Sequence, residues 1–121
     1  MLLYILDDDT IELAFWAEII RRTRPDISFE LFTDCRLFQS YVQKQLPDAC
    51  ILDMIMPYHP GTEVCEWLRN TVGDLPIFFN TALEGDEYQV LADKCHATYM
   101  CKTKMSFSER LDRKSTRLNS S

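Results

Sequence analysis

Glycine is scarce in this chain, and acidic residues outnumber basic ones. Only three glycines occur among 121 residues, and no glycine-rich turn of the kind that binds dinucleotide phosphates follows the first apolar run. Thirteen lysines and arginines stand against nineteen aspartates and glutamates, which gives a formal net charge of -6. Nucleic acids and anionic lipids are bound by basic faces, so this charge argues against direct contact of the domain with either.

Long apolar runs and paired cysteine motifs are also missing. No run approaches the length of a membrane span, and the first one begins at Leu2, which leaves no room for a signal peptide. His59 and His96 fall at no metal-ligand spacing, so we expect both at the surface. The odd number of cysteines and the absence of a C-x-x-C motif favour reduced core thiols and a cytoplasmic protein. The five cysteines are Cys35, Cys50, Cys65, Cys95 and Cys101.

Short apolar runs alternate with segments of helical periodicity, as in one α/β domain. The length and a hydrophobic content of 46% suit a single core. Strands are predicted at 2–6, 28–32, 49–52, 75–79 and 98–101. Helices are predicted at 10–23, after residue 34, at 62–70, at 84–95 and after residue 106. Such alternation predicts a parallel sheet with helices on both faces and right-handed crossovers.

Side chains with capping chemistry mark where these helices should begin. Thr10 is expected to cap the first helix, with Asp9 as a solvated first-turn acid. Asp34 is expected to cap the second helix. Ser106 and Glu109 fit the S-x-x-E capping box of a fifth helix.

Polar residues follow several predicted strands at the point where each strand ends. Asp7 and Asp8 follow the first strand, Asp53 the third, Thr81 the fourth and Lys102 the fifth. The carboxyl ends of strands in an open parallel sheet are where ligands bind. Three gathered carboxylates must hold protons or bind a cation, and an all-oxygen set suits Mg²⁺. Together with a lysine and a hydroxyl donor, these groups are what phosphoryl transfer requires.

Each of these residues has an ordinary structural explanation when it is considered alone. Asp7 or Asp8 would be a helix cap, Lys102 a surface lysine and Thr81 a strand-end threonine. Their joint placement at strand ends is what favours a site. The stretches "ILDDD", "ILDMIMPYHPGTE", "LPIFFNTA" and "YMCKT" have the order and spacing of one known family.

Residues 1–111 resemble the receiver domain of bacterial two-component response regulators. The most specific piece is the D-x-x-M-P-x-x-x-G-x-E run from Asp53 to Glu63. The resemblance implies a flavodoxin-like doubly wound α/β fold, with a five-stranded parallel sheet in the order 2-1-3-4-5 and helices on both faces. It also implies a switch module without an enzyme's turnover.

The resemblance assigns a metal and phosphoacceptor site. Asp53 would accept a phosphoryl group from a histidine kinase or a phosphotransfer protein. Asp8 would be a direct Mg²⁺ ligand and Asp7 an outer one, and Asp53 and the backbone carbonyl of Ile55 would complete the protein's share of the ligands.

The resemblance also assigns a switch. Thr81 would turn towards the phosphoryl group, Lys102 would pair with it, and Tyr99 would turn inward on activation. The fourth helix, fifth strand and fifth helix would form the readout face, which often forms a homodimer in this family.

The sequence departs from the family pattern next to the lysine and beside the acceptor. Thr103 follows Lys102 where the family usually has a proline in a cis peptide, and a cis bond without proline costs about 3–4 kcal/mol. Either this peptide stores strain or it is trans and Lys102 reaches differently. Ile55 and Leu83 are apolar at two places that affect phosphoryl hydrolysis in the family, which predicts a slowly decaying phosphoryl form.

Two other functions remain open from the sequence. A degenerate receiver would serve only as a protein-interaction module, and the change at Thr103 favours this slightly. A metal-dependent phosphatase with an aspartyl intermediate would usually have a second aspartate where this chain has Ile55.

The last ten residues differ in composition from the rest. The string "DRKSTRLNSS" at 112–121 is polar and resembles a translated sequencing adapter, so we expect a non-native tail that leaves the fifth helix truncated.

Overall fold

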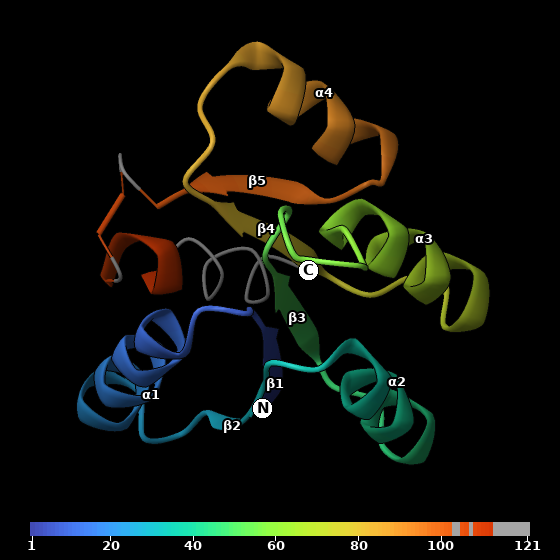
Figure 1. Cartoon of the computed structure of the whole chain (residues 1–121). Helices are drawn as coiled ribbons and strands as arrows, with labels where there is room; N and C mark the ends of the chain where they lie inside the picture. Colours follow the sequence, from blue (N-terminus) through green and yellow to red (C-terminus); the bar gives the residue numbers. More distant parts are fainter. Residues whose placement is uncertain (103–104, 107, 113–121) are drawn as a thin grey trace.

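Five parallel strands form one sheet in the order β2-β1-β3-β4-β5, which confirms the predicted topology (Figure 1). The computed structural model describes residues 1–102, 105–106 and 108–112. β1 and β3 are neighbours although 42 residues lie between the end of β1 and the start of β3. The ends of these two parallel strands therefore meet at the same edge of the sheet. The strands are β1 (Leu2–Leu6), β2 (Ser28–Phe32), β3 (Ala49–Leu52), β4 (Ile77–Thr81) and β5 (Thr98–Cys101).

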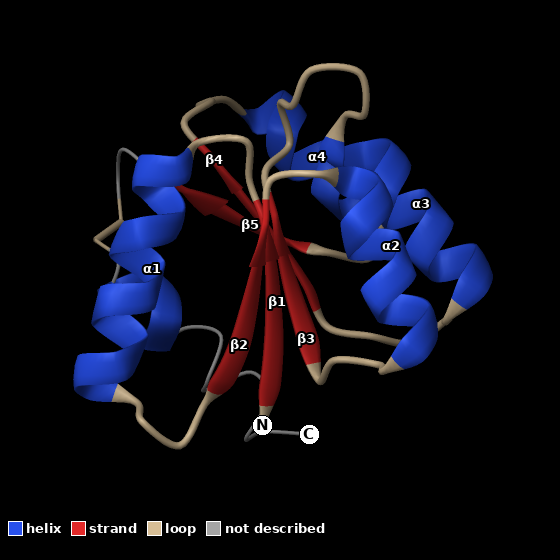
Figure 2. Ribbon diagram, turned by 60° about the horizontal axis from the view of Figure 1, so that its bottom comes forward, coloured by secondary structure: helices blue, strands red, loops and turns tan. Residues whose placement is uncertain are grey.

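Helices cover both faces of the sheet, as the sequence predicts. Figure 2 shows α1 on one face and α2, α3 and α4 on the other. A further helical segment at 108–112 places Leu111 in the same core as α1. The helices are α1 (Thr10–Thr23), α2 (Cys35–Lys44), α3 (Gly61–Thr71) and α4 (Asp86–Lys94).

The sheet divides the interior into two cores, because successive side chains of a strand point to opposite faces. Tyr4 and Leu6 of β1 pack in the core beneath α2, α3 and α4. Leu3 and Ile5 pack in the core beneath α1. Asp7 continues this alternation, so the strand delivers its side chain to the edge of the α1 face.

α1 spans the predicted residues, but its N-cap lies one residue earlier than predicted. Asp9 is the N-cap, because its Oδ1 accepts hydrogen bonds from the N–H groups of Ile11 at 3.0 Å and Glu12 at 3.4 Å. Thr10 is the first helical residue, so its expected role as a cap is wrong. The short aspartate side chain reaches the free N–H groups of the first turn, which a residue already in helical conformation cannot do as well.

The fourth strand lies two residues later than predicted. Leu75 is buried but precedes the strand, and Pro76 takes part in the sheet only through its carbonyl, which accepts a hydrogen bond from the Cys50 N–H. Asn80 and Thr81 extend the strand because they pair with β5. The two polar residues that follow the apolar run 75–79 therefore belong to the sheet.

The predicted cap of α2 is confirmed, and so is the Ser106 half of the predicted capping box. Asp34 caps α2 through the Arg36 N–H, and Ser106 Oγ accepts a hydrogen bond from the Glu109 N–H at 3.1 Å. The Lys102–Thr103 peptide and residues 113–121 lie outside the described residues. No helix within the described ranges has the length and apolar character needed to cross a membrane.

Candidate functional site

The sheet brings three aspartates from two strand ends together. The N–H of Asp53 donates to the Leu6 carbonyl at 3.0 Å, so the residue after β3 lies beside the residue after β1. Each of Asp7, Asp8 and Asp53 offers a carboxylate oxygen, and these oxygens lie within 4.8 Å of one another. The convergence expected from the strand ends is therefore present.

Two of these carboxylates are buried, which changes their acidity. Asp7 is 1% exposed and Asp53 is 7% exposed, whereas Asp8 is exposed. Burial and then the charge of Asp7 raise the pKa of Asp53 to about 7, although the nearby Lys102 acts in the opposite direction. Burial likewise raises the pKa of Asp7, against hydrogen bonds from the Asp9 N–H and from Lys102. In the absence of a cation, Asp53 is therefore held near its titration midpoint at neutral pH.

Lys102 completes the charge arrangement. Its Nζ donates to Oδ2 of Asp7 at 2.9 Å and lies 3.7 Å from Oδ2 of Asp53. Its backbone N–H donates to the Thr81 carbonyl at 2.7 Å, which fixes the lysine at the end of β5 next to the end of β4. Burial opposes its charge, but the hydrogen bond with Asp7 and the charges of Asp7, Asp53 and Glu12 leave the pKa of Lys102 above its ordinary value.

The donor set fits Mg²⁺. All three side chains offer carboxylate oxygens, and the exposed Asp8 leaves one side of the cluster open, which suits an ion that keeps several of its waters. The N–H of Ile55 donates to Oδ1 of Asp53 at 3.2 Å and orients that carboxylate. The role of the Ile55 carbonyl as a ligand stays a prediction.

Thr81 and Tyr99 lie on the neighbouring strands β4 and β5, and both bond to the backbone of Leu83. Thr81 is buried at the end of β4, and its Oγ accepts a hydrogen bond from the Leu83 N–H at 3.2 Å. The Tyr99 hydroxyl donates to the Leu83 carbonyl, and its ring packs against the core under α4. Burial is the main factor that raises the pKa of Tyr99 to about 12, so the hydroxyl keeps its proton. The backbone of Leu83 therefore connects the two residues.

The packing around Gly61 explains why the motif from Asp53 to Glu63 has a glycine at this position. A Cβ at this residue would lie 2.1 Å from the Asp53 carbonyl oxygen and 2.9 Å from Cα of Met54. Only glycine allows α3 to begin this close to the chain that carries Asp53, and the Gly61 N–H donates to the Met54 carbonyl at 2.9 Å.

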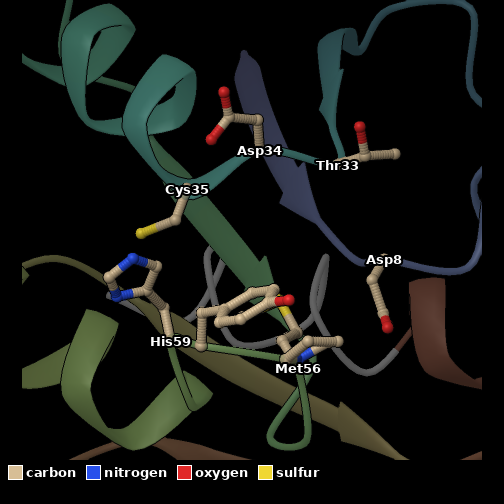
Figure 3. A pocket seen from close by; sticks show the side chains of 8 residues that line it. Asp8, Thr33, Asp34, Cys35, Met56 and His59 are labelled. Carbon is tan, nitrogen blue, oxygen red and sulfur yellow. The ribbon is translucent and has the colours of Figure 1, made fainter.

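A pocket of about 280 Å³ opens beside the exposed aspartate. It lies between the turn that enters α2 and the loop that follows β3. Figure 3 shows Asp8 at one end of the pocket and Cys35 with His59 at the other. Of the three clustered aspartates, the lining of this pocket includes Asp8. The lining residues are Asp8, Thr33, Asp34, Cys35, Met56, Pro57, Tyr58 and His59.

Three further charged or polar residues near the site were not predicted from the sequence. Glu12, Asn80 and Arg110 form a largely buried hydrogen-bonded cluster next to the end of β4. Asn80 could have been noticed, because it is a polar residue within an otherwise apolar strand. Nothing in the sequence indicates that Arg110 pairs with a residue 98 positions earlier.

Comparisons with known proteins agree with this geometry. The response regulator MprA of Mycolicibacterium vanbaalenii is 46% identical over 55 residues, which are 46% of this chain and 24% of that protein. The response regulator MprA of Mycobacterium avium is 37% identical over 84 residues, which are 68% of this chain and 35% of that protein. The chain thus spans about a quarter to a third of the length of these relatives.

The fold matches solved receiver domains over nearly the whole chain. The receiver domain of the Francisella response regulator 1452 superposes with a TM-score of 0.87 at 20% sequence identity, over 98% of this chain and 96% of that one. The family model described as "Response regulator receiver domain" matches residues 3–111. The chain therefore belongs to the response regulator receiver domain family of two-component signalling.

Proposed function

We propose that Asp53 accepts a phosphoryl group from the phosphohistidine of a histidine kinase or a phosphotransfer protein, with Mg²⁺ held by Asp7, Asp8 and Asp53. The observation that supports this most strongly is the meeting of Asp53 with two more carboxylates and the Lys102 ammonium at one sheet edge. Such an arrangement places a nucleophile and a positive charge together in a site that is partly shielded from solvent, as phosphoryl transfer needs.

In this reaction an Asp53 carboxylate oxygen bonds to phosphorus while the phosphorus–nitrogen bond of the donor breaks, and the donor nitrogen keeps the electron pair. Lys102, already 3.7 Å from Asp53, would offset the negative charge of the transferred group. When bound, Mg²⁺ would supply further positive charge against the phosphoryl oxygens and keep Asp53 ionised. The open side of the cluster at Asp8 gives the donor access.

We further propose that phosphorylation shifts a two-state equilibrium. Thr81 would turn its hydroxyl to the phosphoryl group, which would break the hydrogen bond that it now accepts from the Leu83 N–H. The Leu83 carbonyl holds the Tyr99 hydroxyl, so a movement of this segment would change the position of Tyr99. The exposed side chains of Val90 and Leu91 on α4 support a readout or homodimer face formed by α4, β5 and the fifth helical segment. The five free thiols suit the cytoplasm, where cysteines stay reduced.

A degenerate receiver that works only as an interaction module is the second candidate. It is supported by the ion pair of Lys102 with Asp7, which compensates part of the acidic charge without any metal. The two candidates differ in covalent chemistry. Only a phosphorylatable domain gains mass from a phosphodonor.

The test is intact-mass spectrometry after incubation with acetyl phosphate and Mg²⁺. We expect a gain of one phosphoryl group, its loss in Asp53→Asn, and its loss when a chelator removes Mg²⁺. An unmodified wild-type mass after long incubation, with and without a histidine-kinase donor, would favour the interaction module.

A further inference from the structure

Arg110 is almost completely buried, although arginine is rarely found in that environment without a partner. Its exposed fraction is 2%, and its Nη1 donates to Glu12 Oε1 at 2.8 Å and to Asn80 Oδ1. Asn80 Nδ2 in turn donates to the same Glu12 oxygen at 3.2 Å. The guanidinium lies over the Trp16 ring, with Cζ 5.2 Å from the centroid. The cluster joins α1, β4 and the 108–112 segment.

This cluster lies directly behind the phosphoacceptor site. Asn80 immediately precedes Thr81 and pairs in the sheet with Met100, two residues before Lys102. By the alternation of strand side chains, Asn80 and Lys102 point to the α1 face, as Asp7 does. Glu12 is one of the groups whose charge raises the pKa of Lys102, after the larger effects of burial and of Asp7 and Asp53. The charge of Glu12, a carboxylate outside the acidic site, therefore acts on Lys102.

We propose that Arg110 is a positioning residue for Lys102: by holding Glu12 together with Asn80, it prevents that carboxylate from drawing the Lys102 ammonium away from Asp7 and Asp53. The inference rests on the proposed function, in which Lys102 acts beside Asp53. A carboxylate with little solvent access needs a cation, and the side chain of Glu12 is only 13% exposed. If Arg110 is removed, Lys102 remains as a long, flexible cation on the same face of the sheet, and the charge of Glu12 already acts on it.

The proposal makes two opposite predictions for Arg110→Met, which keeps an apolar stem over Trp16. The initial rate of phosphorylation by acetyl phosphate should fall about tenfold, because Lys102 no longer faces Asp53. The affinity for Mg²⁺ should rise, because the three aspartates lose the positive charge that competes with the ion. General damage to the site would lower both quantities, so their opposite movement identifies the positioning role.

The experiment compares four variants with the wild type by phosphorylation rate, Mg²⁺ titration calorimetry and thermal melting at one ionic strength. Glu12→Gln combined with Arg110→Met removes both charges, so Lys102 has no competing partner, and rate and Mg²⁺ affinity should return to within about twofold of the wild type. Arg22→Met is the matched control, since Arg22 is an exposed arginine of α1 paired only loosely with Glu18 at 3.9 Å. Arg110→Lys keeps a cation next to Glu12 and should stay near the wild type.

A parallel fall of rate and Mg²⁺ affinity in Arg110→Met would overturn the proposal, as would a double variant that melts cooperatively but keeps the slow rate. If Arg110→Met alone shows no cooperative melting transition, the double variant decides: a wild-type rate supports the proposal and a slow one overturns it. Phosphorylation of Asp53→Asn at the wild-type rate would instead contradict the proposed function itself, so the two failures are distinguishable.

Discussion

The Lys102 ammonium lies 2.9 Å from Oδ2 of Asp7, a residue 95 positions earlier in the chain. Because the same ammonium is 3.7 Å from Asp53, the lysine is shared between two buried carboxylates but is closer to the one that would not carry the phosphoryl group. Without a metal this contact limits the repulsion within the acidic cluster. It also means that a cation entering the cluster competes with Lys102 for Asp7, and that Lys102 becomes freer to face Asp53 once Asp7 has another partner.

Lys102→Met should separate the role of Lys102 in compensating the charge of Asp7 from its role beside Asp53 in phosphorylation. Removing one partner of a largely buried ion pair leaves Asp7 uncompensated, so the free energy of unfolding at neutral pH should fall by on the order of 3 kcal/mol without Mg²⁺. Added Mg²⁺ should recover part of this loss, yet phosphorylation should stay slow because the lysine is missing. Urea denaturation and the acetyl phosphate assay measure the two quantities.

Lys44→Met is the control for Lys102→Met, since Lys44 is exposed in the last turn of α2. It should change neither the free energy of unfolding nor the rate of phosphorylation appreciably. A Lys102→Met protein as stable as the wild type at neutral pH would contradict the ion pair.

The raised pKa of Asp53 predicts a pH-dependent gain of stability in Asp53→Asn. An acid whose pKa is about 7 when folded and about 4 when unfolded binds more protons in the folded state between these values. Its contribution to stability is therefore lost as the pH rises from about 4 to about 7, by no more than about 4 kcal/mol. Asp53→Asn removes this penalty, so the variant should exceed the wild type clearly at pH 8 and little at pH 5.

The measurement is urea denaturation at pH 5 and pH 8 with a chelator present. Saturating Mg²⁺ should reduce the difference at pH 8, because the cation stabilises the ionised carboxylate that the wild type alone possesses. An equal effect of Asp53→Asn at both pH values would show that burial does not raise the pKa of Asp53.

Gly61→Ala tests the close approach of α3 to the acceptor. The added methyl group would meet the backbone of Asp53 and Met54, which cannot rotate away as a side chain can. We expect a loss of about 1–3 kcal/mol in the free energy of unfolding and slower phosphorylation, because the shift is transmitted to Asp53. Both effects are measurable with the assays described above.

Gly73→Ala offers a matched comparison for that substitution. Gly73 has a φ of +87° but open space around its Cβ position, so alanine strains the backbone by about 1 kcal/mol without touching the site. Its phosphorylation rate should equal that of the wild type. Equal rates for Gly61→Ala and the wild type would show that α3 can move without displacing Asp53.

The positions of Asp7, Asp53 and Lys102 could be predicted from the sequence, because topology alone brings the ends of neighbouring parallel strands to one edge. The choice between Thr10 and Asp9 as the cap could not be predicted, because both have capping side chains and the cap depends on where the backbone first turns helical. The polar end of β4 could not be predicted, because Asn80 pairs with β5 and its side chain bonds to α1 and the 108–112 segment. Contacts of this range leave no periodic pattern in a sequence.

The surroundings of Asp53 predict a long-lived phosphoryl form. The exposed fraction of Ile55 is 59%, so its side chain stands at the surface two residues after the acceptor, where it can neither donate to nor accept from a water molecule. Leu83 is half-buried and also apolar. Hydrolysis needs a water oriented in line with the phosphorus, and a polar side chain would hold one there. Ile55→Asn should therefore shorten the lifetime of the Asp53 phosphoryl group by about tenfold, as followed by intact mass after removal of the donor.

The control for this lifetime is Ile11→Asn, the same substitution at an exposed isoleucine of α1 whose exposed fraction is 67%. It should leave the lifetime unchanged, which separates a local effect on water from a general effect of surface polarity. A wild-type lifetime of seconds with Mg²⁺ present would mean that another group near Asp53 positions the attacking water. The exposed Asp8 is the first to examine in that case, because its carboxylate is within 4.8 Å of the acceptor oxygen and open to solvent.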